Sequence, residues 1–272
     1  MKLKVNLYGG TFKHNKIEGK TTSTQNKLPK YIEYVEDSSG SINLFVDRAI
    51  YDVENIGNGL KNYGWLLESH SITKDLLDYF RDNTEEKIKN FKFIFTHNKE
   101  LIDLNKKFKF LHPIGYWVDD INNIKKTKLI SMVTSNKRHT LMATKRYEFA
   151  KKNFNKIDIF GNGFHTIFNK EVGLNPYYFS VVFENDTTPD YFSEKLLDCF
   201  ATKTIPIYFG SKNIAEYFDI KGIVDFDDFK LNELTPAIYK DLEKHVDNNF
   251  KIVQNYRSPE DVMYKNYLVT AD

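Results

Sequence analysis

Short apolar runs alternate with longer amphipathic segments along most of the chain. A short apolar run predicts a β-strand, whereas apolar residues that recur every three or four positions predict a helix. Because the two kinds of segment alternate, we expect parallel sheets covered by helices, which is the α/β class. The expected strands are Leu3–Tyr8, Ser41–Val46, Gly64–Leu67, Lys92–Thr96, Phe108–Leu111, Leu129–Thr134, Ile157–Phe160 and Tyr178–Phe183. The expected helices are Ile72–Phe91, Leu141–Lys152 and more than one helix within Glu233–Tyr267.

The stretch Asp119–Lys128 is polar and has no core pattern, so it is the best candidate for a linker. The alternation of strands and helices restarts after it. We therefore expect two Rossmann-like domains that face a cleft, formed by residues 1–122 and 123–272, with helices at the end of the second.

The segment Tyr177–Ser211 has the clearest order of elements: an apolar strand, a polar loop, a helix, and a second strand that ends in Gly210-Ser211. Thr188-Pro189-Asp190 predicts the start of the helix, because Thr or Asp can cap a helix and Pro suits its first turn. This helix would open at the carboxyl edge of a parallel sheet, where α/β folds bind their ligands. Its free N–H groups would suit a diphosphate.

Two faces can be assigned to this expected helix from the spacing of its residues. An ordinary solvated face is the alternative interpretation of the polar side. The polar side carries an aromatic residue and charges of both signs, which favours a binding site. The buried face is expected to hold Phe192, Leu196, Leu197 and Phe200, and the polar face Tyr191, Glu194, Lys195 and Asp198.

Composition narrows the class of protein. The 272 residues include 39 basic and 37 acidic ones, and a net charge of +2 gives no indication of nucleic-acid binding. The single cysteine, Cys199, excludes an internal disulfide and a cysteine zinc site. No stretch reaches the ~20 apolar residues that a membrane-spanning helix needs. We expect a soluble protein without a transmembrane segment, in the cytoplasm of a bacterium or of a virus-infected host cell.

The segment Tyr177–Ser211 resembles the donor-binding motif of glycosyltransferase family 10, the α-1,3/1,4-fucosyltransferases. The resemblance extends over about Ile157–Asp225 and is thin before Ser131. It implies a fold of the GT-B type, with the donor bound by residues 123–272 and the acceptor side formed by residues 1–122. The matching residues are Phe183-Glu184-Asn185, Tyr191, Ser193-Glu194-Lys195, Asp198, Ile205-Pro206-Ile207-Tyr208 and Gly210-Ser211.

The reaction that the resemblance implies is inverting transfer of L-fucose from GDP-fucose to a hydroxyl of a glycan acceptor. A transferase for another GDP-sugar and a catalytically idle nucleotide- or glycan-binding protein of the same fold are the alternatives. An NAD-dependent oxidoreductase is disfavoured, because no Gly-x-Gly-x-x-Gly opens a helix after a strand with the expected acidic residue downstream.

A departing diphosphate needs cations, and Lys195 on the polar face is the first candidate. The family has a Ser-Asn followed by an Arg that meets the diphosphate, and Ser135-Asn136 and Arg146 match it with a longer spacing. Lys145 and Arg138 therefore compete with Arg146. The guanidinium fork of an arginine suits phosphate oxygens.

The remaining donor-site residues are implied by the resemblance. Glu194 would accept hydrogen bonds from sugar or ribose hydroxyls, and Asn185 and Tyr191 would donate to phosphate oxygens. Asp158, Gly161 and Lys170 match an Asp-x-x-Gly and a later Lys of the family, and Gly161 is included in the expected donor site. Gly161-x-Gly163 on its own indicates a turn more than a nucleotide site.

The general base is expected in the N-terminal half. Glu68 follows the short strand Gly64–Leu67, and in the family a Glu at a comparable strand end acts as the base. A surface Glu is the plain alternative. His70 is the rival base, because an unperturbed imidazole has a pKa of about 6.5, and His97 at the next strand end is a candidate for the acceptor side.

Asp225-Phe226-Asp227 spells Asp-x-Asp, the metal motif of a different glycosyltransferase architecture. Matches of three residues are frequent by chance, and carboxylates without convergent geometry do not specify a metal site. The histidines have no zinc spacing. We therefore expect no metal and no cofactor besides the donor substrate GDP-fucose.

Overall fold

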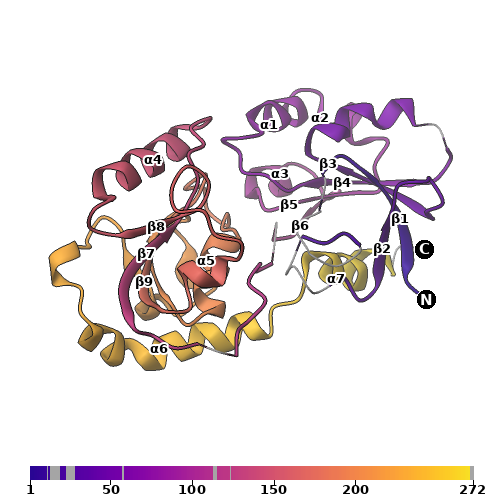
Figure 1. The fold of residues 1–272 in the computed structure, drawn as a ribbon. Coiled ribbons are helices and arrows are strands. Elements are labelled where there is room, and N and C mark those ends of the chain that lie inside the picture. The colour runs from indigo at the N-terminus through magenta and orange to yellow at the C-terminus, as the bar shows by residue number, and fades with distance from the viewer. Residues whose placement is uncertain are drawn as a thin grey trace. The chain divides into compact units, whose positions relative to one another are not determined.

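The computed structural model describes residues 1–10, 12, 19–22, 28–56, 58–112, 115–122 and 124–269. The chain forms two compact units, one of Met1–Gly115 with Arg257–Asp272 and the other of Tyr116–Tyr256. Each unit is built on a parallel β-sheet (Figure 1). The predicted α/β class, with a parallel, Rossmann-like sheet in each half, is confirmed.

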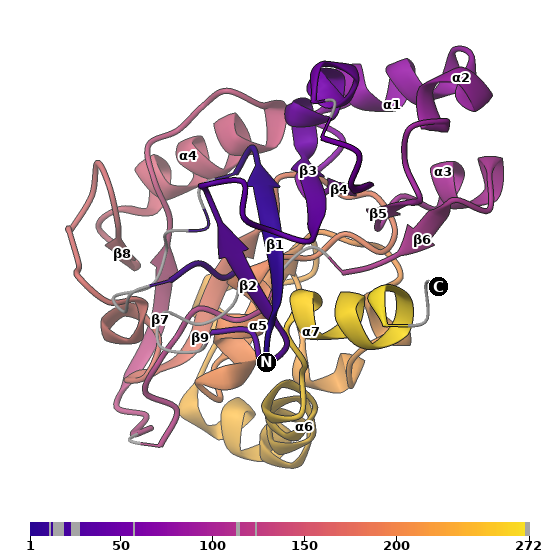
Figure 2. The ribbon, with the colours of Figure 1, turned by 90° about the vertical axis from the view of Figure 1, so that its right-hand side faces the viewer.

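In its described residues the first unit has a six-stranded sheet in the order β2-β1-β3-β4-β5-β6, and every neighbouring pair is parallel. Successive residues of a strand point to opposite faces, so Phe45 and Leu44 enter different cores. Helices α1, α2 and α3 cover one face and α7 the other (Figures 1 and 2). The strands are β1 (Leu3–Tyr8), β2 (Ile32–Val35), β3 (Ile42–Val46), β4 (Lys61–Leu66), β5 (Phe93–Thr96) and β6 (Phe108–Phe110). The helices are α1 (Lys74–Arg81), α2 (Thr84–Ile88), α3 (Lys99–Leu104), α7 (Pro259–Met263), the 3-10 helix η1 (Asp47–Asn55) and the π-helical turn η6 (Tyr264–Leu268).

The prediction of one helix over Ile72–Phe91 is wrong. Helix α1 ends at Arg81, and α2 begins after Asn83, whose φ of 56° lies in the left-handed region. Asparagine tolerates this conformation better than most residues. The apolar positions of the pattern are nevertheless buried in one core, because both short helices pack on the same face of the sheet.

The C-terminal segment belongs to the first unit, whereas the sequence pattern placed it in a domain of residues 123–272. The buried carboxylate of Glu260 accepts a hydrogen bond from the backbone N of Thr22 at 2.7 Å, and Asp261 accepts one from the backbone N of Lys30 at 2.8 Å. Met263 is buried in the core beneath the first sheet. The expected linker Asp119–Lys128 lies inside the second unit, and its residue Asn123 falls outside the described residues.

The second unit has a five-stranded parallel sheet, in the order β11-β10-β9-β7-β8, in the residues that are described. Helix α5 packs on one face of this sheet, and α4 and most of α6 contribute to the core on the other. The strands are β7 (Lys128–Val133), β8 (Asp158–Phe160), β9 (Tyr177–Phe183), β10 (Ile205–Phe209) and β11 (Val224–Asp225). The helices are α4 (Leu141–Asn153), α5 (Glu194–Ala201), α6 (Pro236–Gln254) and the 3-10 helices η2 (Lys170–Gly173), η3 (Ile214–Glu216), η4 (Ile220–Gly222) and η5 (Leu231–Glu233).

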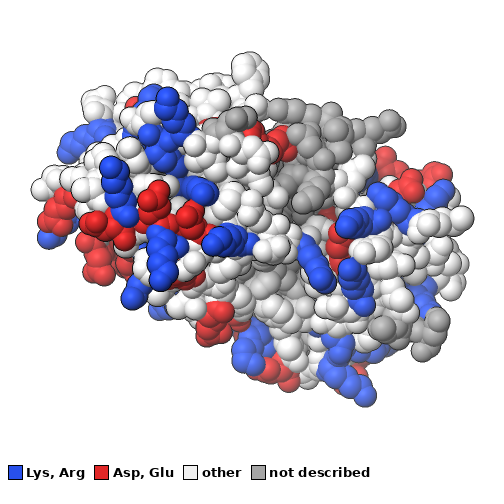
Figure 3. All heavy atoms as spheres, turned by 90° about the horizontal axis from the view of Figure 1, so that it is seen from below, with Lys and Arg blue, Asp and Glu red and all other residues white. Residues whose placement is uncertain are grey.

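The surface shows no concentration of one sign of charge on the face drawn in Figure 3, where lysines and arginines are interspersed with acidic residues among the residues that the picture describes. In the described part of the chain, no helix is long and apolar enough to cross a membrane.

Candidate functional site

A cavity of about 180 Å³ lies at the carboxyl ends of β7 and β9 in the second unit. This edge of a parallel sheet is where α/β folds bind ligands. The cavity brings together Ser135, Arg146, Glu194 and Lys195 from the expected donor site. Its further lining residues are Val133, Thr134, Lys170, Leu174, Ser180, Val181, Val182, Phe183 and Asp198.

Helix α5 begins at Glu194, and the predicted start at Thr188-Pro189-Asp190 is wrong. Ser193 is the N-cap, and the fully buried Glu184 holds it in place: Oε1 accepts from the backbone N of Ser193 at 2.8 Å, and Oε2 accepts from its Oγ at 2.6 Å. Asp190 has a φ of 67° and accepts hydrogen bonds from Asn213 and Tyr217, so the chain turns there instead of entering a helix.

Within α5 the predicted faces are confirmed, because Leu196, Leu197 and Phe200 pack in the core, whereas Glu194, Lys195 and Asp198 line the cavity. The assignment of Tyr191 and Phe192 to this helix is wrong. Tyr191 and Phe192 precede the helix, and both are buried. Along α5 itself only Lys195 is not fully buried, with 23% of its side chain exposed. Tyr191 does not line the cavity, although it lies close enough to Arg146 to affect the pKa of the guanidinium.

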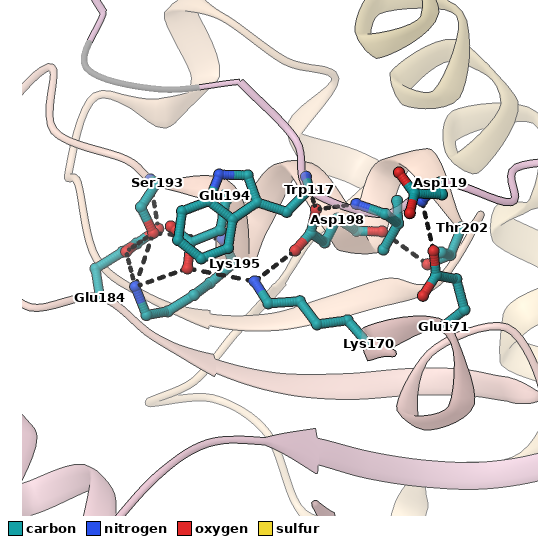
Figure 4. Close-up of polar contacts among 11 residues, drawn as sticks. Trp117, Asp119, Lys170, Glu171, Glu184, Ser193, Glu194, Lys195, Asp198 and Thr202 are labelled. Atoms are coloured by element: carbon teal, nitrogen blue, oxygen red, sulfur yellow. Dashed lines mark hydrogen bonds and ion pairs between the residues drawn. The ribbon is translucent and has the colours of Figure 1, made fainter. Parts of the chain in front are cut away.

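A cluster of charged groups occupies the α5 side of the cavity (Figure 4). Lys170 Nζ lies 2.7 Å from Asp198 Oδ2 and 3.3 Å from Glu194 Oε1. Lys195 Nζ lies 3.0 Å from Ser193 Oγ, 3.5 Å from Glu194 Oε1 and 3.8 Å from Glu184 Oε2. Three buried carboxylates are thus compensated by two lysines, in agreement with the rule that buried charges are paired.

The lysines lower the pKa of all three carboxylates, but only at Glu194 do they outweigh burial. Burial raises the pKa of Glu194, but the charges of Lys195 and Lys170 outweigh burial and hold its pKa at about 2. Burial raises the pKa of Glu184 and that of Asp198 above their usual values. Glu194 is therefore a constant hydrogen-bond acceptor within the cavity at neutral pH.

Arg146 is a third cation near these carboxylates, because the charges of Glu184 and Glu194 act on its guanidinium. Its side chain on α4 is 6% exposed, and burial lowers the pKa of its guanidinium. Nη1 donates to Asn185 Oδ1 at 3.2 Å, while the buried Nε has no acceptor among the described residues. The competitors Lys145 and Arg138 are exposed. The charges of Glu184 and Glu194 offset this burial only in part, because the pKa stays lowered, so Arg146 is suited to bind a further anion.

Gly161 does not line the cavity but closes the turn beside it. Its φ is 116°, and a Cβ atom there would lie 1.8 Å from the carbonyl oxygen of Thr134. Thr134 does line the cavity. Gly161 therefore allows the backbone of Thr134, rather than a nucleotide, to come close.

Substitution of Gly161 by alanine should lower the stability of the protein by about 3 kcal/mol or more, because backbone strain adds to a clash with a backbone oxygen. Gly59→Ala is the matched control, since Gly59 also has a positive φ, of 71°, but no described atom lies within 4 Å of its Cβ position. Thermal denaturation followed by circular dichroism measures both. Equal midpoints for the two variants would contradict the expectation.

The expected base and its neighbours meet in the first unit. Glu68, His70 and His97 line a small cavity of about 20 Å³ at the ends of β4 and β5. The backbone N of Glu68 donates to Asp47 Oδ1 at 3.1 Å, as does that of Leu67 at 2.9 Å. The Nε2 of His70 is buried without a hydrogen-bond partner in the described part of the chain.

No group of three or more His, Cys, Asp or Glu side chains that could hold a metal occurs among the described residues. The Asp-x-Asp sequence forms a local turn, in which the backbone N of Asp227 donates to Asp225 Oδ1 at 2.8 Å. Cys199 is a buried free thiol in α5.

Sequence reasoning left three polar residues out of the expected donor site: Lys170, Glu184 and Asp198. Lys170 and Asp198 line the cavity, and Glu184 supports Ser193. All three belong to positions that match the family, but the pattern gives no indication of their contacts, which are Lys170 with Asp198 and Glu184 with Ser193 and Lys195.

A parallel α/β unit with buried cations at the carboxyl ends of its strands is typical of proteins that bind nucleotides. The family model described as glycosyltransferase family 10 (fucosyltransferase), C-terminal part, matches residues 123–261, just over half of the chain. The chain therefore belongs to glycosyltransferase family 10, and it is a glycosyltransferase.

Two solved structures illustrate the likeness. One is a crystal structure of an α1,3-fucosyltransferase, with 18% identity over 94% of this chain and 81% of that chain and a TM-score of 0.48. The other is an α1,3-fucosyltransferase with GDP-fucose, with 18% identity over 95% of this chain and 82% of that chain and a TM-score of 0.47. No curated protein matches the chain.

Proposed function

We propose that this glycosyltransferase moves L-fucose from GDP-fucose to a hydroxyl of a glycan acceptor, with inversion at the sugar's anomeric carbon. The observation that carries the proposal is Arg146, a buried guanidinium with one hydrogen bond among the described residues, at 3.2 Å, in the cavity that Lys195 also lines. A diphosphate would supply an acceptor for the Nε–H of Arg146, which has none among the described residues, and would meet both cations. Membership of the fucosyltransferase family supports fucose as the sugar.

The groups around the cavity have distinct roles in this proposal. Arg146 and Lys195 neutralise the diphosphate, and Asn185, which already contacts Arg146, donates its amide to a phosphate oxygen. Glu194 accepts hydrogen bonds from ribose or sugar hydroxyls, because Lys195 and Lys170 keep it ionised. Ser135 completes the wall beside β7.

The transfer itself is a single displacement. The bond between the anomeric carbon and the diphosphate oxygen breaks, the acceptor oxygen bonds to the opposite face of that carbon, and the acceptor proton passes to a base. We assign the base to Glu68 in the first unit and the support of the departing GDP to Arg146 and Lys195. His97, buried at the end of β5, is the further residue assigned to the acceptor side.

GDP should raise the thermal midpoint of the protein, whereas UDP, CMP and NAD should not. A ligand that binds only the native state stabilises it by about 2.7 kcal/mol at a hundred times its dissociation constant. Differential scanning fluorimetry with the four nucleotides at equal concentrations tests this. A selective shift with UDP or NAD would overturn the proposal, and a transfer assay with GDP-fucose beside GDP-mannose distinguishes the sugar.

We further propose that transfer needs no metal ion, with Arg146 and Lys195 providing the positive charge. Activity should then persist in excess EDTA at the same rate as without it. The measurement is release of GDP in the presence of chelator. A complete loss that manganese restores would assign a metal to the reaction and contradict this expectation.

A further inference from the structure

Lys170 lines the cavity and lies between two carboxylates of the charged cluster. Its Nζ joins Asp198 at 2.7 Å and Glu194 at 3.3 Å, and it lies 4.6 Å from the centre of the Trp117 ring. Figure 4 shows Lys170 reaching between these side chains. Although burial lowers the pKa of a lysine, the two carboxylates outweigh burial and raise the pKa of Lys170. It is therefore a fixed positive charge.

The two carboxylates that Lys170 contacts have different partners. Asp198 is fully buried, and its Oδ1 accepts the backbone N–H groups of Trp117 and Val118. Glu194 faces the cavity, and its Oε1 is shared by Lys170 and Lys195. Lys170 thus connects Asp198, which holds the backbone at Trp117 and Val118, to Glu194, which faces the cavity.

The geometry of α5 makes this link necessary. Glu194 and Asp198 lie one helical turn apart, where like charges repel, and both are buried. Without a cation between them, one carboxylate would take up a proton or turn away from the other. Glu194 would in either case lose one of the two lysines that hold its Oε1, which would alter its position as a hydrogen-bond acceptor.

We propose that Lys170 positions Glu194 for donor binding. Lys170 holds Oε1 of Glu194, and this leaves Oε2 to accept hydrogen bonds from the hydroxyls of the nucleotide sugar. This inference deepens the proposed function and rests on it. Lys170 touches no reacting atom in this scheme. Its loss should consequently affect donor binding more than the rate of the bound complex.

Lys170→Met removes the charge and keeps most of the volume. It should raise the KM for GDP-fucose by roughly 10- to 50-fold and change kcat by less than about threefold. Lys170→Arg keeps the charge and should return the KM to within about fivefold of the wild-type value. Calorimetry with GDP and initial rates with GDP-fucose measure these effects.

Two further variants separate positioning from plain charge compensation. In Lys170→Met/Asp198→Asn neither partner is left as an unpaired charge, so the thermal midpoint should recover while the KM stays high. Lys203→Met is the matched control, because Lys203 also has a carboxylate, Asp247 at 2.7 Å, and an aromatic ring, Phe250 at 4.8 Å, yet does not line the cavity. It should keep the wild-type KM.

The outcomes are distinguishable. If the double variant recovers the KM together with the midpoint, Lys170 only compensates Asp198, and the positioning role is overturned. If the wild type binds GDP and Lys170→Met binds it equally well, the inference alone fails. A wild type that binds no GDP overturns the proposed function and this inference together. Should Lys170→Met not fold, the arginine and double variants decide the question.

Discussion

Replacement of Arg146 by methionine should weaken GDP binding by roughly 10- to 150-fold, and it should leave the ligand-free protein at least as stable as the wild type. Loss of charge-assisted hydrogen bonds to a diphosphate costs about 1.5–3 kcal/mol. The free protein loses the hydrogen bond to Asn185 and the attraction of Glu184 and Glu194, but it is relieved of a buried cation for which burial outweighs these charges. Binding groups at active sites commonly reduce stability in this way.

Lys145→Met is the matched control for this experiment. Lys145 precedes Arg146 on the same helix and is exposed, so its replacement should change neither GDP affinity nor the thermal midpoint. Isothermal titration with GDP and thermal denaturation without ligand measure the two properties separately. If Arg146→Met lowers stability and affinity together, Arg146 supports the fold; if Lys145→Met alone loses affinity, the assignment of the phosphate-binding residue is wrong.

The strands were the part of the fold that the sequence predicted best. Tyr178–Phe183 is mostly apolar on both faces, as buried parallel strands are, and Leu3–Tyr8 alternates apolar with polar residues, as half-buried strands do. The observed β1 and β9 agree with these runs to within one residue. Strand β2 was missed, because Ile32–Val35 is short and alternates a glutamate with its apolar residues. Local pattern therefore identifies central strands more readily than short ones at an edge.

The start of α5 could not be predicted, because it depends on a contact with Glu184, which lies at the end of β9 and before the loop. Thr188-Pro189-Asp190 has every local feature of a helix start. Glu184, however, binds both the backbone N and the Oγ of Ser193 and so sets the N-cap there. A tertiary hydrogen bond overrides the local preference.

The same limit applies to the site. Arg146, Glu194 and Lys195 were expected to meet, since strand ends and helix starts converge at one edge of a parallel sheet, and all three line the cavity. The pairing of Lys170 with Asp198 was not foreseen. It joins η2 to α5 across residues far apart in the chain, and no spacing rule connects them.

Glu68→Gln should reduce the transfer rate by roughly 10²- to 10⁴-fold while GDP affinity stays close to the wild-type value, as expected for loss of a general base. The substitution keeps the shape of the side chain and removes its basicity. The backbone at Glu68 is fixed just after the end of β4, because its N–H donates a hydrogen bond to Asp47 Oδ1 at 3.1 Å. Burial raises the pKa of Asp47 to about 6, with the two backbone N–H groups opposing that rise.

His70→Ala is the comparison that decides between the two candidate bases. The Nε2 of His70 is buried and has no hydrogen-bond partner in the described part of the chain. A buried nitrogen is poorly placed to take a proton from the hydroxyl of an acceptor substrate. We therefore expect His70→Ala to reduce the rate by less than Glu68→Gln. Steady-state rates at saturating GDP-fucose and GDP affinity should be measured for both variants side by side. A fully active Glu68→Gln beside a folded, GDP-binding but inactive His70→Ala would transfer the role of base to His70.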